Sequence, residues 1–219
     1  DILARDGFDQ ILSPPRTQAL SLPWPSLQHA LSGLHPGQLI LIAGQTSDGK
    51  TSLALQIAAH AARDGAVLIA SLEMDPASLI RRMTAQRARL DSAALRRGAL
   101  AGEEASAAIY AASAISDRPI HIQHGAMSVA TIAATARMLQ RSESLKLLVV
   151  DYLQLLRSER VRDSRAQEVS ANSRALKLLA QELAIPIILI SQLSRAPAKM
   201  GRTAEIYDLK ESGDIENDA

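Results

Sequence analysis

The sequence predicts an α/β fold in which a mostly parallel β-sheet carries helices on both faces. Apolar runs at residues 66–72, 147–150 and 186–190 have strand length and lack the polar alternation of a half-exposed strand, so we expect each to be covered on both sides. Segments with helical periodicity separate these runs. Strands that alternate with helices in this way are typical of a parallel sheet, whose ligands bind beyond the carboxyl ends of the strands.

Length and composition favour a single domain. The chain has 219 residues, of which 47% are hydrophobic, and that is enough to bury one sizeable core. We expect a linker over residues 1–26, where prolines prevent one long helix, and a folded core over residues 27–219. A short helix around residues 27–31 would end at Gly33. Trp24 either covers the core, the commoner role of a tryptophan, or offers a stacking surface to an adenine base.

The composition also excludes several classes of site. The chain contains no cysteine, which rules out disulfides, thiolate zinc sites and cysteine nucleophiles. Its formal net charge is +1, so any nucleic-acid surface must come from local clusters of basic residues. No apolar run approaches the roughly 18 residues of a membrane-spanning helix, and the first residues do not have the pattern of a signal peptide. We therefore expect a cytoplasmic protein with no membrane partner.

Residues 44–51 carry the most informative motif. They read Gly-Gln-Thr-Ser-Asp-Gly-Lys-Thr and fit G-x-x-x-x-G-K-[ST], with an apolar run at 39–43 before them and a helix-compatible run after them. This context predicts a P-loop, in which backbone N–H groups close around the phosphates of a nucleoside triphosphate. Lys50 adds a positive charge, and the Thr51 hydroxyl can ligate Mg²⁺. The alternative is a glycine-rich turn that binds nothing.

The predicted ligands are ATP and Mg²⁺, and the nucleotide contacts are drawn from the loop and the residue that follows it. These contacts are Gly44, Gln45, Thr46, Ser47, Asp48, Gly49, Lys50, Thr51 and Ser52. Asp48 is the unusual member of the set. A carboxylate inside an anion-binding loop repels phosphate unless its side chain points away.

The rest of the chain continues the alternation of helix and strand. Asp75 followed by Pro76 starts a helix that runs to about residue 89, and an alanine-rich helical region extends to about residue 115. A short strand at 119–123 precedes a helix capped by Ser128, and the clearest amphipathic helix covers 165–184. The arginines between residues 81 and 97 are spread around the turns, which favours a solvated face over a binding site. They are Arg81, Arg82, Arg87, Arg89, Arg96 and Arg97.

Polar residues end three of the buried strands. Asp151 follows 147–150 at the Walker B position, where a carboxylate holds Mg²⁺ through water; the alternative is an aspartate in a strand-end turn. Glu73 is the candidate base, because a carboxylate near the phosphates but off the metal can orient the attacking water; the alternative is a cap of the next helix. Gln192 both donates and accepts hydrogen bonds, which suits a sensor of the γ-phosphate. The predicted catalytic residues are thus Glu73, Lys50 and Gln192, and the metal ligands are Thr51 and Asp151.

Several of these blocks resemble DnaB-type replicative helicases in their order and spacing. They are residues 44–51, 71–74, 151–156, 191–195 and 208–219, which together span the chain from about residue 27. The resemblance implies a RecA-like P-loop ATPase domain that works as a homo-hexamer around single-stranded DNA, with a loader or a primase as a further partner. It also implies Glu73 as the base, Gln192 as the coupling residue, and channel-facing loops near residues 157–165 and 195–208.

Basic residues in these two loops are the predicted DNA contacts. They are Arg160, Arg162, Arg195, Lys199 and Arg202. Acidic residues dilute both clusters and Tyr207 is the only aromatic residue among them, so we expect contact with the DNA backbone without reading of base sequence. Without the resemblance, a solvated charged loop is an equal alternative.

Two departures from the family limit the function expected of this stretch. Nothing in it resembles the family's N-terminal domain, and it stops before the strands that carry the family's basic finger, so we expect a core that is truncated at its C-terminus. Residues 1–219 alone should bind ATP but hydrolyse it at little more than background. The leading hypothesis is an ATP-dependent DNA helicase motor that translocates on single-stranded DNA in replication. The alternatives are a recombinase-like or clock-type RecA ATPase, and a nucleotide-binding assembly platform without turnover.

Overall fold

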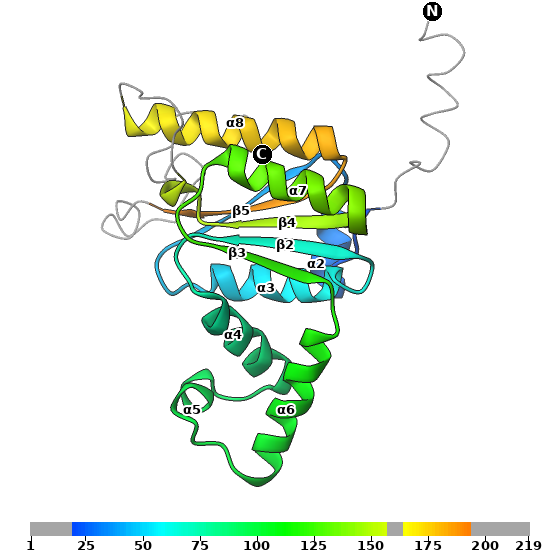
Figure 1. Cartoon of the computed structure of the whole chain (residues 1–219), viewed down its shortest axis with the longest axis vertical. Helices are drawn as coiled ribbons and strands as arrows, with labels where there is room; N and C mark the ends of the chain where they lie inside the picture. Colours follow the sequence, from blue (N-terminus) through cyan, green and yellow to red (C-terminus); the bar gives the residue numbers. More distant parts are fainter. Residues whose placement is uncertain (1–18, 157–163, 194–219) are drawn as a thin grey trace, which may run out of the picture.

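The structure is a computed structural model, and it describes residues 19–156 and 164–193. At its centre lies a five-stranded sheet with the strand order β1-β5-β4-β2-β3, in which all neighbouring strands are parallel (Figure 1). The strands are β1 (Leu39–Gly44), β2 (Ala66–Ser71), β3 (Ile120–His124), β4 (Leu145–Asp151) and β5 (Ile187–Gln192). The predicted α/β fold with a mostly parallel sheet is confirmed.

Helices cover both faces of the sheet. They are α2 (Pro25–Leu31), α3 (Lys50–Ala61), α4 (Pro76–Ala88), α5 (Ser92–Arg97), α6 (Gly102–Ser116), α7 (Val129–Glu143) and α8 (Arg165–Leu183), with a short 3₁₀ helix η1 (Leu153–Leu155). Helices α7 and α8 lie on one face and α3 on the other, with α4, α5 and α6 extending away beyond α3 (Figure 1). The alanine-rich region forms two helices, because Gly98 ends α5 in the left-handed conformation with φ 66°.

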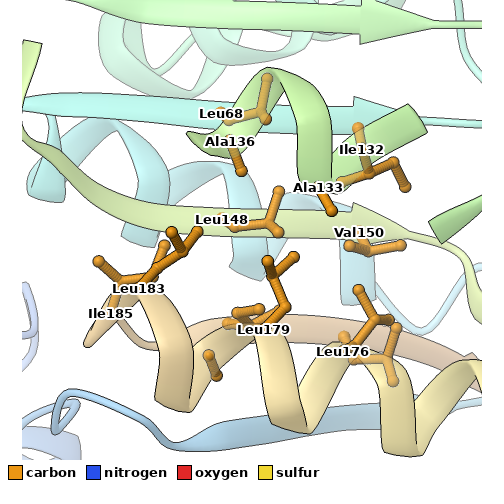
Figure 2. Close-up of a cluster of buried hydrophobic side chains, with 14 of the residues drawn as sticks. Leu68, Ile132, Ala133, Ala136, Leu148, Val150, Leu176, Leu179, Leu183 and Ile185 are labelled. Carbon is orange, nitrogen blue, oxygen red and sulfur yellow. The ribbon is translucent and has the colours of Figure 1, made fainter. Parts of the chain in front are cut away.

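Alternate residues of the central strands face two separate hydrophobic clusters. Leu148 and Val150 of β4 and Leu68 of β2 pack beneath α7 and α8, whose contacts include Ile132 and Leu179 (Figure 2). The intervening β4 residues, at positions 147 and 149, belong to the cluster on the α3 side. Both faces of these strands are therefore dry, which is why their sequence is apolar without alternation.

The chain is packed from Leu20 onward. Leu20 and Leu34 form an antiparallel bridge with N–H to carbonyl distances of 2.8 and 2.9 Å. Gly33 is required beside this bridge, since its φ is 92° and an added Cβ would lie 2.9 Å from the Leu20 carbonyl oxygen. Leu20 and Leu22 are buried in the α3-side cluster and Trp24 packs against it, so packing begins within the predicted linker and Trp24 covers the core.

The strand register brings the polar strand ends together at one edge of the sheet. Gly44 at the end of β1 lies opposite Gln192 at the end of β5. Ser71 at the end of β2 lies opposite Asp151 at the end of β4. This is the carboxyl edge, where open parallel sheets bind their ligands.

Candidate nucleotide-binding site

Residues 45–49 connect β1 to α3 at this edge, in the strand, loop and helix order that the motif predicts. Gly49 precedes the first residue of α3 and has φ 88°, a left-handed conformation that glycine adopts without steric cost. The first N–H groups of a helix have no carbonyl partners within it. Together with the positive end of the helix dipole, they make the start of α3 suited to binding an anion.

A cavity of about 780 Å³ opens beside the loop. Its walls come from the P-loop and the start of α3, from the turn after β2, from α4 and the residues that follow it, and from the end of β5. Six of the predicted nucleotide contacts line it, namely Thr46, Ser47, Gly49, Lys50, Thr51 and Ser52. The other three, Gly44, Gln45 and Asp48, do not appear on its wall.

The Asp48 carboxylate turns back onto its own loop. Its Oδ2 accepts a hydrogen bond of 2.6 Å from the backbone N–H of Gln45. The same residue is also held through its carbonyl, because Lys50 Nζ donates to the Gln45 oxygen at 2.5 Å. The side chain of Asp48 thus braces the loop from outside the cavity, whereas Lys50 lines it.

Thr51 and Asp151 meet at the base of the site. The Thr51 Oγ1 hydroxyl donates to Asp151 Oδ2 at 2.8 Å. Asp151 is only 3% exposed, and burial raises the pKa of its carboxyl above the ordinary value. The hydrogen bond from Thr51 works against this shift, while the negative charge of Glu73 adds to it.

This pair fits the donor set that Mg²⁺ uses at a nucleotide site. Mg²⁺ keeps several waters and binds through one or two carboxylates together with substrate phosphates. Among the described residues no group of three or more His, Cys, Asp or Glu side chains forms a metal cage, so the remaining ligands would come from phosphate and water. A cation beside Asp151 would also compensate for the burial of its charge.

Glu73 is held in the turn between β2 and α4. The Ser71 hydroxyl fixes this turn, since it donates to the Met74 carbonyl at 2.7 Å and accepts from the Met74 N–H at 3.1 Å. Glu73 lines the cavity and is exposed. The cap of α4 is Asp75, whose Oδ1 accepts from the Ser78 N–H at 3.0 Å, so the alternative interpretation of Glu73 as the helix cap does not hold.

Gln192 lines the cavity from the end of β5. The next residue, Leu193, donates its N–H to the Gly44 carbonyl at 3.1 Å, so the end of β5 is bonded to the start of the P-loop. On the other side, the Gln192 N–H donates to Gln154 Oε1 at 3.5 Å. The three predicted catalytic residues, Lys50, Glu73 and Gln192, therefore border the same cavity.

Helix α4 supplies a wall that sequence reasoning missed. Arg82, Gln86 and Arg89 line the cavity, and their spacing of four and three residues places them on one side of the helix. Gln86 Nε2 donates to the Ser52 carbonyl at 2.9 Å, which ties α4 to the first turn of α3. The prediction that the arginines of this region form a solvated face is therefore wrong for Arg82 and Arg89. The available signal was the position of α4 directly after Glu73.

A sequence model of the DnaB-like helicase C-terminal domain matches residues 20–219. The chain belongs to this family. The resemblance to DnaB-type helicases that the motifs indicate is thereby confirmed.

Curated relatives of this DnaB-like domain are replicative helicases. It is 38% identical to the replicative DNA helicase DnaB of Leifsonia xyli subsp. xyli over 197 residues, which cover 88% of this chain and 43% of that protein. It is equally similar to the DnaB of Geobacillus stearothermophilus, at 38% over 198 residues, with 88% of this chain and 44% of that protein covered. The chain thus spans less than half the length of these relatives.

Solved structures agree with this assignment. A DnaB-like replicative helicase, described with its interactions with primase, superposes with a TM-score of 0.90 and 29% identity over 100% of this chain and 55% of that one. A second solved structure, of an isolated ATPase domain, gives a TM-score of 0.86 and 30% identity over 98% of this chain and 78% of that one. These matches support the RecA-like interpretation of the fold.

The predicted DNA contacts of the DnaB-like domain, Arg160, Arg162, Arg195, Lys199 and Arg202, lie outside the described residues. The two segments that carry them begin after Leu156 and after Leu193, at the same edge of the sheet as the cavity. Within the described ranges, no helix has the length and apolar character needed to cross a membrane.

Proposed function

We propose that this chain is the ATP-hydrolysing motor domain of a replicative DNA helicase that translocates on single-stranded DNA. The observation that carries the proposal is that one cavity beside the P-loop is bordered both by Thr51, which is bonded to Asp151, and by Glu73. Phosphoryl transfer from ATP needs a place for the metal and a separate group to position the nucleophile. Membership of the DnaB-like family directs this chemistry toward a helicase.

ATP binding is the first task of these residues. The backbone N–H groups at the start of α3 hold the phosphates. The Lys50 ammonium, bonded to the Gln45 carbonyl in this structure, exchanges that oxygen for phosphate oxygens. Thr51 and Asp151 hold Mg²⁺, which when bound neutralises charge on the β- and γ-phosphates.

Hydrolysis then depends on Glu73. Its carboxylate accepts a hydrogen bond from the attacking water and takes the proton as the oxygen bonds to the γ-phosphorus. The bond between that phosphorus and the β–γ bridging oxygen breaks, and ADP and inorganic phosphate leave. Gln192 borders the same cavity and reports the presence of the γ-phosphate through β5 to the loop that follows it.

The partners that we propose follow from the family. They are single-stranded DNA, further copies of the same chain in a homo-hexamer, and a loader or a primase. A solved DnaB-like relative is described with its interactions with primase, which supports the last of these. We expect the protein to act in the cytoplasm.

The test is ATP turnover by the full-length protein with and without single-stranded DNA, together with separation of a forked duplex. DNA-stimulated turnover and strand separation are expected, and both should be lost in Lys50→Ala because the loop loses its only full positive charge. Filament formation with strand exchange would instead identify a recombinase-like ATPase. Nucleotide binding without turnover would identify an assembly platform.

A further inference from the structure

Gln154 is a buried glutamine located where the strand that carries Asp151 becomes a loop. It lies in η1 and is 8% exposed. Its Nε2 donates to the Oγ of Ser191 at 2.9 Å, and its Oε1 accepts the N–H of Gln192 at 3.5 Å. Ser191 itself is fully buried. One carboxamide therefore reaches from the end of β4 to the end of β5.

This link replaces a backbone ladder that has already stopped. The pairing of β4 with β5 runs from Leu148 opposite Ile187 to Val150 opposite Leu189. Beyond Leu189, the last residues of β5 pair with β1 on the other side, where Gln192 lies opposite Gly44. On the β4 side, the Gln154 side chain supplies the lateral hydrogen bonds at the level of Ser191 and Gln192.

The backbone of Gln154 is bonded in turn to α8. Arg165, the first residue of α8, donates from Nη2 to the Gln154 carbonyl and from Nη1 to Glu168. Gln154 and Arg165 flank the predicted DNA loop that begins after Leu156. Through Ser191 and Gln192, the same glutamine also reaches the strand end from which the second predicted DNA loop continues. Both loops thus leave the sheet next to one buried side chain.

We infer that Gln154 is a positioning residue that couples DNA contact to ATP turnover. It does so by fixing the strand end that bears Gln192 against the strand end that bears Asp151. The inference rests on the proposed function and adds the element through which DNA in either loop affects the nucleotide site. Buried hydrogen bonds suit this task, because they are stronger in a low-dielectric interior and unsatisfied polar groups there are costly.

Gln154→Met tests the coupling, since methionine keeps the length and approximate volume of the side chain but removes the carboxamide. Ser191→Ala removes the same hydrogen bond from the other side. In the full-length protein, each should lower the ratio of DNA-stimulated to basal kcat by at least about fivefold, the lower end of typical coupling between two sites. The double variant should lose no more than the larger single effect, because both changes remove one interaction.

Gln140→Met is the matched control. Gln140 is a half-buried glutamine of α7 whose Nε2 donates to the Leu183 carbonyl at 3.0 Å, in the α8 end that precedes β5. It should retain the parental ratio, and an equal loss in this variant would overturn the inference by showing a general effect of removing a buried amide.

The outcomes separate the inference from the proposed function. If single-stranded DNA does not stimulate the unmodified protein, the proposed function fails and the inference fails with it. If stimulation is present and folded Gln154→Met keeps the parental ratio, only the inference is overturned. Should Gln154→Met not fold, Ser191→Ala decides alone, and an unchanged ratio in it overturns the coupling role.

Discussion

The Thr51 hydroxyl donates a hydrogen bond of 2.8 Å to the Asp151 carboxylate, across 100 residues of sequence. The two side chains come from different elements, since Thr51 belongs to the first turn of α3 and Asp151 ends β4. The parallel sheet brings them together because the carboxyl ends of its strands share one edge. This contact joins the phosphate-binding loop to the carboxylate that we assign to Mg²⁺.

Asp151→Asn should weaken the dependence of ATP binding on Mg²⁺. The neutral amide still accepts the Thr51 hydrogen bond but no longer attracts a hydrated cation. We expect apparent Mg²⁺ affinity to fall by about 10- to 100-fold, as for other residues that act on a metal through an intervening group. Titration of Mg²⁺ into protein and ATP measures this effect. Asp117→Asn, at the exposed end of α6, is the control, and equal Mg²⁺ affinity in both variants would remove Asp151 from the metal site.

The same carboxyl should make the ligand-free protein less stable as pH rises. Burial raises the pKa of Asp151 in the folded state, so the unfolded chain loses this proton at a lower pH than the folded chain does. Between the ordinary pKa and the raised one, the folded state binds more protons, and the free energy of unfolding falls as pH increases. Below that window both states are protonated and the effect is absent.

Asp151→Asn should therefore raise the Tm of the protein at pH 7 to 8 in the absence of nucleotide and Mg²⁺. The gain should be about 2–4 °C per kcal/mol for a chain of this size, and it should shrink as the pH is lowered below the ordinary aspartate pKa. Thermal unfolding over a pH series measures it. A Tm for Asp151→Asn below that of the parent at pH 8 would contradict the assigned direction of the pKa shift.

The site residues that sequence predicted are those that lie at strand ends. Lys50, Glu73, Asp151 and Gln192 each follow or end an apolar run, and in a parallel sheet that position alone brings them to one edge. The order of the strands does not need to be known for this argument. It is also why the fold class could be predicted from the alternation of buried strands and helices.

The residues that sequence reasoning missed depend on tertiary packing. Arg82 and Arg89 look like part of an evenly charged helix until α4 is placed against the P-loop, where Gln86 is bonded to the Ser52 carbonyl. Gln154 resembles an ordinary loop residue, and its bond to Ser191 joins positions 37 residues apart. Neither contact has a periodicity or a motif, because a side-chain hydrogen bond between distant elements leaves no local pattern.

Glu73→Gln should bind ATP with Mg²⁺ but hydrolyse it slowly. Glutamine has nearly the same shape but cannot take a proton from water, so kcat should fall by about two to four orders of magnitude, the usual contribution of a positioned general base. Steady-state turnover with a parallel measurement of nucleotide binding separates the two effects. Glu104→Gln, in the exposed first turn of α6, should keep parental kcat. A parental kcat in Glu73→Gln would exclude Glu73 as the base.

Replacement of Arg195, Lys199 and Arg202 by glutamine should weaken binding of single-stranded DNA evenly across base sequences. Each lost phosphate contact should reduce the salt dependence of log K by up to about 0.7. Nucleotide binding should persist, because none of the three belongs to the P-loop. Binding of oligonucleotides of different sequence over a salt series measures both quantities. Unchanged affinity and salt slope in the assembled protein would show that this loop does not face the DNA.

Asp48→Asn should tighten ATP binding at low salt. The asparagine side-chain oxygen can still accept the Gln45 N–H that Asp48 Oδ2 accepts at 2.6 Å, so the loop keeps its brace while it loses a negative charge close to the phosphates. For an exposed charge the gain is small, about 0.2–1 kcal/mol or up to roughly fivefold in affinity.

Salt distinguishes this electrostatic gain from a change in the shape of the loop. The Debye length shortens to about 3 Å at 1 M salt, so the advantage of Asp48→Asn should disappear there. Asp48→Ala, which loses the brace as well as the charge, should bind ATP less tightly than Asp48→Asn at every salt concentration. Asp64→Asn, an exposed position beyond the far end of α3, should match the parent throughout. Weaker ATP binding by Asp48→Asn at low salt would show that the loop requires the carboxylate itself, because only a charged acceptor then holds the Gln45 N–H firmly enough to keep the loop in its phosphate-binding shape.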